Sequence, residues 1–391
     1  MHCLDCKREF ELDQSLLLCP ECGGLLELGF VINNIQLTQL KGRGVWKYAP
    51  LLAGDYPFKV SLGEGSTPLI RSRVYPNLYY KFEGTNPTGS FKDRGMCVAV
   101  SSALKLGYKS VIVASTGNTA ASAAAYSARA GLQAYLLLPS NNVAKGKIAQ
   151  ALLHGAKLIE VSGGFDSALE NAIQLYRNKR TLYPLNSYNP WRLEGQKTLS
   201  FEVFEDIGVP DYVFVPVGNG GNIYAIWKGF KELEISGLSS GIPRMFGVQA
   251  KDASPIVRAI ENNLSELRFI ESPQTIASAI RIGKPVNWKK TIKAITDSHG
   301  GAISVSDEEI LKAQVELARV EGVEVEPASA ASFAGYKKLM KEGKIDQNSK
   351  VVCVLTGHAL KDPETIIQES IKIESQFAST FNSVDEVFKM F

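Results

Sequence analysis

The sequence predicts an α/β protein with two three-layer α/β domains, each built on a mostly parallel sheet, behind a short cysteine-bearing N-terminal segment. Two observations lead to this fold class. Short valine-rich apolar runs alternate with helical stretches over most of the chain, and this alternation is typical of parallel strands covered by helices on both faces. The chain also has 391 residues, more than one ordinary core uses and enough for two or three domains.

The elements follow one another along the chain. Strands are predicted at 78–83, 110–115, 133–139, 157–163, 212–218, 244–250 and 350–357. Helices are predicted after Lys92 as far as Gly107, from 116 to Gly131, up to about Leu153, and over about 223–233. We interpret residues 33–58 as a connector, and residues 262–300 carry no clear pattern.

Three units follow from this order. Residues 1–32 form the cysteine-bearing segment, 84–189 a small α/β domain, and 33–83 together with 190–391 a large domain. No internal repeat and no low-complexity stretch interrupts them.

Composition excludes several classes of protein. Apolar residues make up 45% and charged residues 21%, as in soluble globular proteins. The net charge of +3 is too close to neutral to indicate a nucleic-acid partner. No apolar run reaches the roughly 18 to 20 residues of a membrane helix, and MHCLDCKREF lacks the apolar core of a secretory signal. We therefore expect a cytoplasmic enzyme without a nucleic-acid or membrane partner.

Four of the six cysteines form a pattern typical of a metal site. They stand as two CxxC pairs separated by twelve residues: Cys3, Cys6, Cys19 and Cys22. Two such knuckles suit tetrahedral zinc, and a segment this short needs a metal because it cannot build its own core. Two redox dithiols or two disulfides are the alternative, which a reducing compartment makes less favourable. Cys97 and Cys353 lie alone in apolar runs and are predicted core residues.

The stretch NPTGSFKDRG (86–95) places Lys92 in an unusual setting. Pro87 and Gly89 predict a tight turn, and Ser90 is a candidate helix cap. The following MCVAVSSALKLG is a largely apolar helix, so Lys92 belongs in the first turn of a mostly buried helix. A lysine there is costly unless it is paired or used, because desolvation disfavours its charge.

Three loops of small residues each follow a predicted strand directly. Ligands of open parallel sheets bind at the carboxyl ends of strands, where such loops converge. STGNT (115–119) offers hydroxyls and amides at a helix start, and LTGH (355–358) places a hydroxyl at a strand end. VGNGGN (217–222) is either a phosphate cradle or a plain tight turn, and it matches neither the Walker A nor the GxGxxG pattern.

A buried lysine beside a phosphate cradle favours pyridoxal phosphate, which needs a lysine for its Schiff base and an anchor for its phosphate. NPTGSFKDR, STGN, GNGGN and TGHALKD, in this order, resemble the tryptophan-synthase-β-like (fold type II) class of pyridoxal-phosphate enzymes. Within this class the chain is most similar to the threonine synthases, many of which carry an N-terminal zinc-ribbon-like segment. The resemblance covers about residues 60 to 365.

The resemblance implies roles for residues of these motifs. Lys92 would form the Schiff base and act as the acid–base group. Asn118 would bond the 3′-oxygen of the cofactor, and Thr356 would face its pyridine nitrogen. Its phosphate would lie on Gly218, Asn219, Gly220, Gly221 and Asn222. The family usually has glycine where this chain has Ala359. Because the added methyl group is small, we expect the Thr356 contact to survive while the backbone of this loop can differ.

The resemblance also implies a substrate site. Ser115, Thr116 and Thr119 would hold the α-carboxylate of the substrate. The stretch NSYNPWRLEGQKT (186–198) is similar to the substrate-phosphate region of the family, which would use Asn186, Ser187, Asn189 and Arg192. Arginine suits this task because its planar fork grips phosphate oxygens in two places. The residues alone favour a surface arginine beside Glu194.

The implied reaction converts O-phospho-L-homoserine and water into L-threonine and phosphate, in a homodimer. A threonine or serine dehydratase, a cysteine synthase and a cysteate synthase are rival members of the same class. NSYNPWR favours a phosphorylated substrate, which leaves cysteate synthase, a phosphoserine enzyme, as the nearest rival. A non-catalytic zinc-ribbon protein that binds nucleic acid is a distant alternative, because the charge is near neutral and Lys92 is present.

Overall fold

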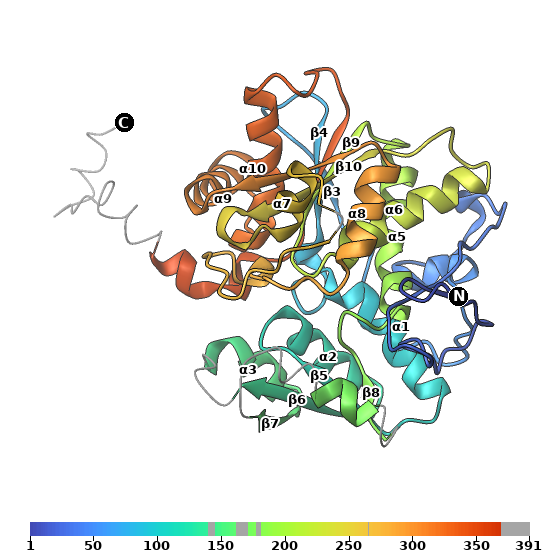
Figure 1. The fold of residues 1–391 in the computed structure, drawn as a ribbon. Helices are drawn as coiled ribbons and strands as arrows, with labels where there is room; N and C mark the ends of the chain where they lie inside the picture. The colour runs from blue at the N-terminus through green and yellow to red at the C-terminus, as the bar shows by residue number, and fades with distance from the viewer. Residues whose placement is uncertain (140–144, 162–170, 177–180, 265, 369–391) are drawn as a thin grey trace, which may run out of the picture.

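A computed structural model describes residues 1–139, 145–161, 171–176, 181–264 and 266–368. Within these residues the chain forms a six-stranded sheet, a four-stranded sheet and a small N-terminal ribbon (Figure 1). The predicted α/β fold class with mostly parallel sheets is confirmed. None of the helices in the described residues has the length and apolar character that a membrane crossing requires.

The larger sheet has the strand order β11-β10-β9-β12-β4-β3, and only the β3–β4 pair is antiparallel. Along β9 and β12 the side chains alternate between two apolar cores, because successive residues of a strand point to opposite faces. The strands are β3 (Leu69–Arg71), β4 (Leu78–Phe82), β9 (Tyr212–Pro216), β10 (Arg244–Ala250), β11 (Gly301–Val305) and β12 (Val351–Leu355).

Helices cover both faces of the larger sheet. One core joins it to α9 (Asp307–Glu321) and α10 (Pro327–Lys341). The core on the other face includes α5 (Trp191–Ile207), α6 (Gly221–Ile235), α7 (Pro255–Glu261) and α8 (Trp288–Asp297). This is the predicted three-layer arrangement.

The smaller sheet is parallel throughout, with the order β7-β6-β5-β8. Its strands are β5 (Ser110–Ala114), β6 (Gln133–Pro139), β7 (Lys157–Val161) and β8 (Tyr183–Pro184). One face packs on α1 (Lys92–Lys105), α2 (Asn118–Arg129) and α3 (Lys145–Leu153). The helical residues 171–176 contribute Ala172 and Leu175 to the core on the other face.

The sequence predictions missed several elements. Strands β8 and β11 and helices α5 and α7–α10 were not expected, and α8 lies in the region without a clear pattern. The connector contains two 3₁₀ helices, at Leu37–Gln39 and Val45–Leu51. Residues 162–163 of one predicted strand lie outside the described residues. The exact domain boundaries stay a prediction.

The N-terminal ribbon pairs β1 (His2–Cys3) with β2 (Leu26–Glu27) and docks on the large domain beside α6 and α8 (Figure 1). The buried Glu27 carboxylate accepts hydrogen bonds from the Tyr224 hydroxyl at 2.5 Å and from Lys293 Nζ at 3.1 Å, and it pairs with His2. Lys290 Nζ donates to the Leu26 carbonyl at 2.8 Å. Polar contacts in a buried interface therefore fix the ribbon against two helices.

Candidate active site

The turn before α1 is fixed by a buried acid. Gly89 has a φ of 82°, a left-handed conformation that favours glycine. The Asp93 carboxylate accepts hydrogen bonds from the Thr88 amide at 2.7 Å and the Thr88 hydroxyl at 2.6 Å. It also accepts one from the Ser122 hydroxyl on α2 at 2.5 Å. The aspartate next to Lys92 is therefore used to hold the turn.

The same turn is joined to the loop that follows β12. The Phe91 amide donates to the Thr356 carbonyl at 3.0 Å, and the His358 amide donates to the Gly89 carbonyl at 2.9 Å. The prediction that Ser90 caps α1 is wrong, since Phe91 takes the N-cap position and no side chain caps the helix. Backbone hydrogen bonds to the loop after β12 fix the turn instead, and they bring the NPTGSFKDR and TGHALKD motifs together.

Lys92 is the first residue of α1, and its amine has no counter-ion. Nζ lies 3.8 Å from the centroid of the Phe91 ring, and no hydrogen bond or ion pair reaches it from the described residues. Burial and then the Arg192 guanidinium lower the pKa of Lys92 to about 7, against the opposing effect of Glu326. Part of the side chain stays accessible. An amine with this pKa can exchange protons near neutral pH.

Helices α1 and α5 cross at two glycines. A Cβ at Gly195 would overlap the Arg94 carbonyl oxygen, and a Cβ at Gly95 would lie 2.6 Å from the Arg192 carbonyl oxygen. Side chains at these positions would force the helices apart. The close crossing brings the guanidinium of Arg192 near enough to act on the charge of Lys92.

Arg192 is buried and unpaired. The residue is 3% exposed, Nη1 donates to the Leu185 carbonyl at 3.0 Å, and Nε has no hydrogen-bond partner among the described residues. The interpretation as a surface arginine beside Glu194 is wrong, because Glu194 pairs with Lys197 and Lys228. Burial lowers the pKa of Arg192 to about 10. A buried guanidinium without a carboxylate is suited to receive an anionic ligand.

The two asparagines before Arg192 brace their own segment. The Asn186 amide donates to the Ala114 carbonyl at 2.9 Å and accepts from the Ala114 amide at 3.0 Å. The Asn189 side chain donates to the Pro184 carbonyl at 2.9 Å and accepts from the Trp191 amide at 3.0 Å. These contacts favour a role in positioning, and direct contact with a substrate phosphate stays a prediction.

The glycine-rich loop lies between β9 and α6, as predicted. Gly220 has a φ of 85° and is the N-cap of α6, and a Cβ there would collide with the Thr291 hydroxyl. Asn219 faces the loop before α8: its Oδ1 accepts from the Val286 amide at 3.2 Å, and its carbonyl accepts from the Asn287 amide at 2.9 Å. The loop therefore needs glycine for its path, and Asn219 anchors it.

Polar atoms without partners lie beside this loop. Asn222 is 7% exposed, and within the described ranges neither the nitrogen nor the oxygen of its side-chain amide has a hydrogen-bond partner. Asn287 donates to the Ser187 carbonyl at 2.9 Å, while its Oδ1 has no partner. Gly218 and Gly221 leave little room for a side chain, because an added Cβ would have its nearest neighbouring atom at 3.1 Å. Buried amides without partners are rare, and they indicate a polar ligand at this helix start.

The STGNT loop leads into α2. Ser115, Thr116 and Thr119 are partly exposed, and a Cβ at Gly117 would meet no atom within 4 Å. The Ser115 hydroxyl accepts from the Gly117 amide at 3.3 Å. Asn118 is the first residue of α2 and is buried. Accessible hydroxyl-bearing residues and open space beside Gly117 therefore lie at a helix N-terminus, where a carboxylate is favoured.

The loop after β12 places Thr356 next to residues that the sequence did not reveal. Thr356 is 5% exposed, and its Oγ1 lies 3.0 Å from the Ser329 hydroxyl. Ser329 also accepts from the Gly357 amide at 2.7 Å. Glu326, the N-cap of α10, accepts from Asn118 Nδ2. The stretch EPAS (326–329), a helix start with proline at its first position, is a signal that could have indicated them.

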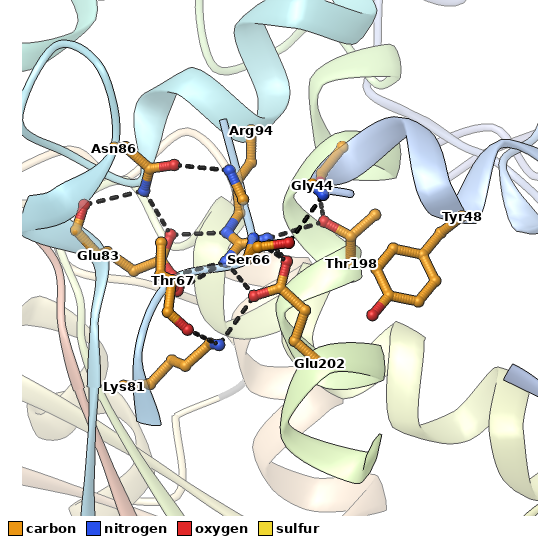
Figure 2. Close-up of polar contacts among 12 residues, drawn as sticks. Gly44, Tyr48, Ser66, Thr67, Lys81, Glu83, Asn86, Arg94, Thr198 and Glu202 are labelled. Atoms are coloured by element: carbon orange, nitrogen blue, oxygen red, sulfur yellow. Dashed lines mark hydrogen bonds and ion pairs between the residues drawn. The ribbon is translucent and has the colours of Figure 1, made fainter. Parts of the chain in front are cut away.

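A second set of charges, all buried, surrounds Arg94, which lies two residues after Lys92 on α1. Figure 2 shows Arg94 of α1 between Glu83 and Glu202, with ion pairs at 2.6 and 2.7 Å. Lys81 pairs with Glu202 at 2.8 Å. Burial raises the pKa of Glu202, but the charges of Arg94 and Lys81 outweigh this effect and lower the pKa to about 2. This network joins α1, α5 and β4, so it fixes the helix that carries Lys92.

The four predicted metal ligands come together in the ribbon. The sulfur atoms lie within 4.8 Å of one another, and all six cysteines of the chain are free. Zn–S bonds of about 2.3 Å imply sulfur–sulfur distances of about 3.8 Å in a tetrahedron. The Cys3–Cys22 and Cys6–Cys19 sulfur distances of 3.4 and 3.6 Å are close to this value and too long for a disulfide. Cys97 and Cys353 are buried in the core, as predicted.

Comparison with known proteins agrees with this geometry. The family model described as pyridoxal-phosphate dependent enzyme matches residues 60–357. The chain belongs to this family. It is 50% identical to the threonine synthase of Methanocaldococcus jannaschii over 95% of this chain and 96% of the relative, and 48% identical to that of Methanosarcina acetivorans over 94% and 93%. These relatives place the chain among the threonine synthases.

Two solved structures share the fold of this chain. Maize serine racemase superposes with a TM-score of 0.65 at 22% identity, covering 79% of this chain and 93% of that one. A threonine deaminase from Solanum lycopersicum gives 0.64 at 22% identity, covering 75% and 79%. Both likenesses support the fold class.

The residues present fit the cofactor of the family. A lysine amine without a counter-ion meets the need for a Schiff base, and the path of the glycine loop leaves amides at the start of α6 for a phosphate. Asn222 has two side-chain atoms free for hydrogen bonds. Ala359, the departure from the family pattern, is buried in the 3₁₀ helix Ala359–Lys361, and its effect on the Thr356 contact stays a prediction.

Proposed function

We propose that this threonine synthase converts O-phospho-L-homoserine and water into L-threonine and phosphate. The observation that carries the proposal is a pair of cations without counter-ions among the described residues, the partly buried Lys92 amine and the buried Arg192 guanidinium. Folding gains nothing from leaving both unpaired, so they are best explained by ligands that supply a reactive carbonyl group and an anion.

Lys92 is the acid–base residue of the proposal. When bound, pyridoxal phosphate supplies an aldehyde for the amine and a conjugated ring that accepts electrons from the substrate. The amine then takes the proton from Cα of the substrate and moves a proton at Cβ. A pKa near 7 lets it accept and return protons at neutral pH. Asp93 is not available for this task because Thr88 and Ser122 hold it.

The remaining cofactor contacts come from the three loops. Asn118 would bond the 3′-oxygen, and the Thr356 hydroxyl would face the pyridine nitrogen. The amides of Gly218, Gly220 and Gly221 and the free side-chain atoms of Asn222 would hold the cofactor phosphate. Asn219 would contribute its backbone, since its side chain holds the loop before α8.

The substrate would span two anion sites. The partly exposed Ser115, Thr116 and Thr119 would hold the α-carboxylate at the start of α2, where a carboxylate is favoured. Arg192 would bind the substrate phosphate, with Ser187 beside it. Asn186 and Asn189 would support this site by fixing the backbone around it.

We also propose zinc in the Cys3, Cys6, Cys19 and Cys22 cluster, a homodimeric state and a cytoplasmic location. The spacing and proximity of the four sulfur atoms support zinc. The family resemblance supports the homodimer, and the location follows the expectation from composition. Metal analysis of purified protein should find about one zinc per chain, released when the thiols are alkylated under denaturing conditions. A chain purified with four reactive thiols and no metal would contradict the zinc assignment.

One set of assays tests the function. Purified protein with pyridoxal phosphate should release threonine and phosphate in equal amounts from O-phospho-L-homoserine. Borohydride reduction followed by peptide mass spectrometry should find the cofactor on Lys92. O-phospho-L-serine, L-serine and L-threonine serve as competing substrates, and preferred turnover of one of them would contradict the proposal. Lys92→Ala should abolish both readouts, whereas Lys105→Ala, at the other end of α1, should change neither.

A further inference from the structure

Glu326 is a buried acid that neither the motifs nor the proposed mechanism uses. It is 4% exposed, it is the N-cap of α10, and its amide donates to the Gly357 carbonyl at 3.1 Å. Asn118 Nδ2 approaches both of its carboxylate oxygens, at 2.9 and 3.1 Å. This contact joins the first residue of α2 in the smaller sheet's domain to the start of α10 beside the larger sheet.

The space for this contact depends on a missing side chain. A Cβ on Gly357 would lie 2.5 Å from Glu326 Oε1 and 3.4 Å from Asn118 Nδ2. Even alanine at 357 would push the carboxylate away from the amide. The TGH loop, which touches the Lys92 turn on one side, therefore receives Glu326 on the other.

We propose that Glu326 is a positioning residue of the active site, which fixes the orientation of the Asn118 amide and acts on the charge of the Lys92 amine. An ionised carboxylate only accepts hydrogen bonds, so Nδ2 of Asn118 must face it. One N–H of Asn118 is then used by Glu326, and the other stays available to an acceptor atom of the cofactor. This inference rests on the proposed function, because it assigns Asn118 to the cofactor.

Four groups determine the ionisation of Glu326. Burial raises the pKa of Glu326 to about 7, the Asn118 hydrogen bond and the charges of Lys361 and Lys92 oppose this, and Asp362 adds to it. Lys92 titrates in the same range and is favoured in its charged form by Glu326. Loss of the negative charge at 326 should therefore make the Lys92 amine easier to deprotonate.

A pH titration of the visible absorbance of the bound cofactor tests the proposal, since this absorbance reports the protonation of its link to Lys92. Glu326→Gln keeps the shape of the side chain and removes its charge. We expect the midpoint to fall by about 1 pH unit, the effect of one opposite charge close to the amine. Glu324→Gln, an exposed position two residues earlier, should leave the midpoint unchanged. An unchanged midpoint in Glu326→Gln would overturn the proposal.

The protein without cofactor gives a second, independent readout. The pKa of folded Glu326, about 7, lies above its ordinary value of 4.5, so Glu326 makes the fold less stable as pH rises between these values. Glu326→Gln should therefore lose less thermal stability than wild type between pH 5 and about 8. An equal loss in both proteins would contradict a buried, ionising Glu326. Failure to bind pyridoxal phosphate would instead contradict the proposed function, so the two failures are distinguishable.

Discussion

Two neighbouring cations of α1, the partly buried Lys92 and the buried Arg94, have completely different surroundings. Arg94 is held by two carboxylates, two threonine hydroxyls and a network that reaches three elements (Figure 2). Lys92, two residues earlier, has an aromatic ring and no counter-ion among the described residues. Full pairing fixes Arg94 as charged and immobile. The lack of pairing leaves Lys92 with a lowered pKa and a free amine.

The same contrast recurs on α5, the helix that crosses α1. Glu194 and Lys197 belong to a buried network with Lys228 and Glu232 of α6. Arg192, two residues before Glu194, donates a hydrogen bond to a backbone carbonyl and has no carboxylate partner in the part of the chain that the structure describes. At each helix start stands a cation without a carboxylate partner among the described residues, and the paired charges follow two or more residues later in the helix. Burial alone therefore does not distinguish a structural charge from a functional one; the presence of a partner does.

The largest expected effect is on Lys92. Lys92→Met should lower kcat by at least about 10²- to 10⁴-fold, the contribution of a positioned acid–base group. The folded pKa of Lys92 lies below its ordinary 10.5, so the wild-type fold carries a cost below pH 7 that disappears as pH rises towards 10.5. Unfolding of the cofactor-free proteins in urea should thus find Lys92→Met more stable than wild type at pH 7, by a margin that shrinks at higher pH. A variant less stable at pH 7 would contradict an unpaired, buried amine.

Arg94→Met should have the opposite effect on stability: it should destabilise the fold. Removing one partner of a buried ion pair costs about 3 to 5 kcal/mol, because it leaves the charges of Glu83 and Glu202 uncompensated. Urea unfolding of the cofactor-free protein measures this loss. Activity that survives at low temperature, with an unchanged KM, would agree with a structural role. If Arg94→Met were as stable as wild type, the ion pairs of Arg94 would not stabilise the fold, and the distinction between Arg94 and Lys92 would be wrong.

Arg192→Met is the matched change on α5. Charge-assisted hydrogen bonds contribute about 1.5 to 3 kcal/mol, so KM for the phosphorylated substrate should rise about 10- to 100-fold. Stability should stay the same or increase, since a buried unpaired charge is removed. Steady-state kinetics and urea unfolding give both numbers. Unchanged KM together with strong destabilisation would make Arg192 a structural residue like Arg94.

The sequence predicted the parts of the site that have local signatures. Lys92, the GNGGN loop and the strand before each motif follow from glycine positions and valine-rich runs, which act within a few residues. The ribbon cysteines followed from spacing, and their four sulfur atoms do come together. Which side chain holds which ligand atom was supplied by the family resemblance, and these roles stay predictions.

The contacts that cross the chain could not be predicted. Glu326 meets Asn118 across 208 residues, and Arg94 meets Glu202 across 108. Nothing near Glu326 in the sequence shows that its partner is on α2. Arg192 was similarly ambiguous, because its burial depends on the glycine crossing of α1 and α5, and Ser90 had the residue type of a cap but not the geometry. Pairing between distant segments is decided by packing.

The smallest expected effect compares two serines of α10. The Ser329 hydroxyl contacts Thr356 Oγ1 at 3.0 Å and the Gly357 amide at 2.7 Å, whereas Ser332, one turn later, bonds the Ser329 and Val354 carbonyls. Each alanine substitution should cost about 1 kcal/mol of stability, the usual net value of such bonds. Because Ser329 orients the residue that would face the pyridine nitrogen, only Ser329→Ala should also weaken cofactor binding, by about fivefold if the same 1 kcal/mol is lost there. Fluorescence titration of the cofactor-free proteins with pyridoxal phosphate measures this difference. Equal affinity in the two variants would show that the Ser329 contact holds the loop without orienting Thr356. The difference between structural and functional groups would then apply to the charged residues of α1 and α5 and not to the serines of α10.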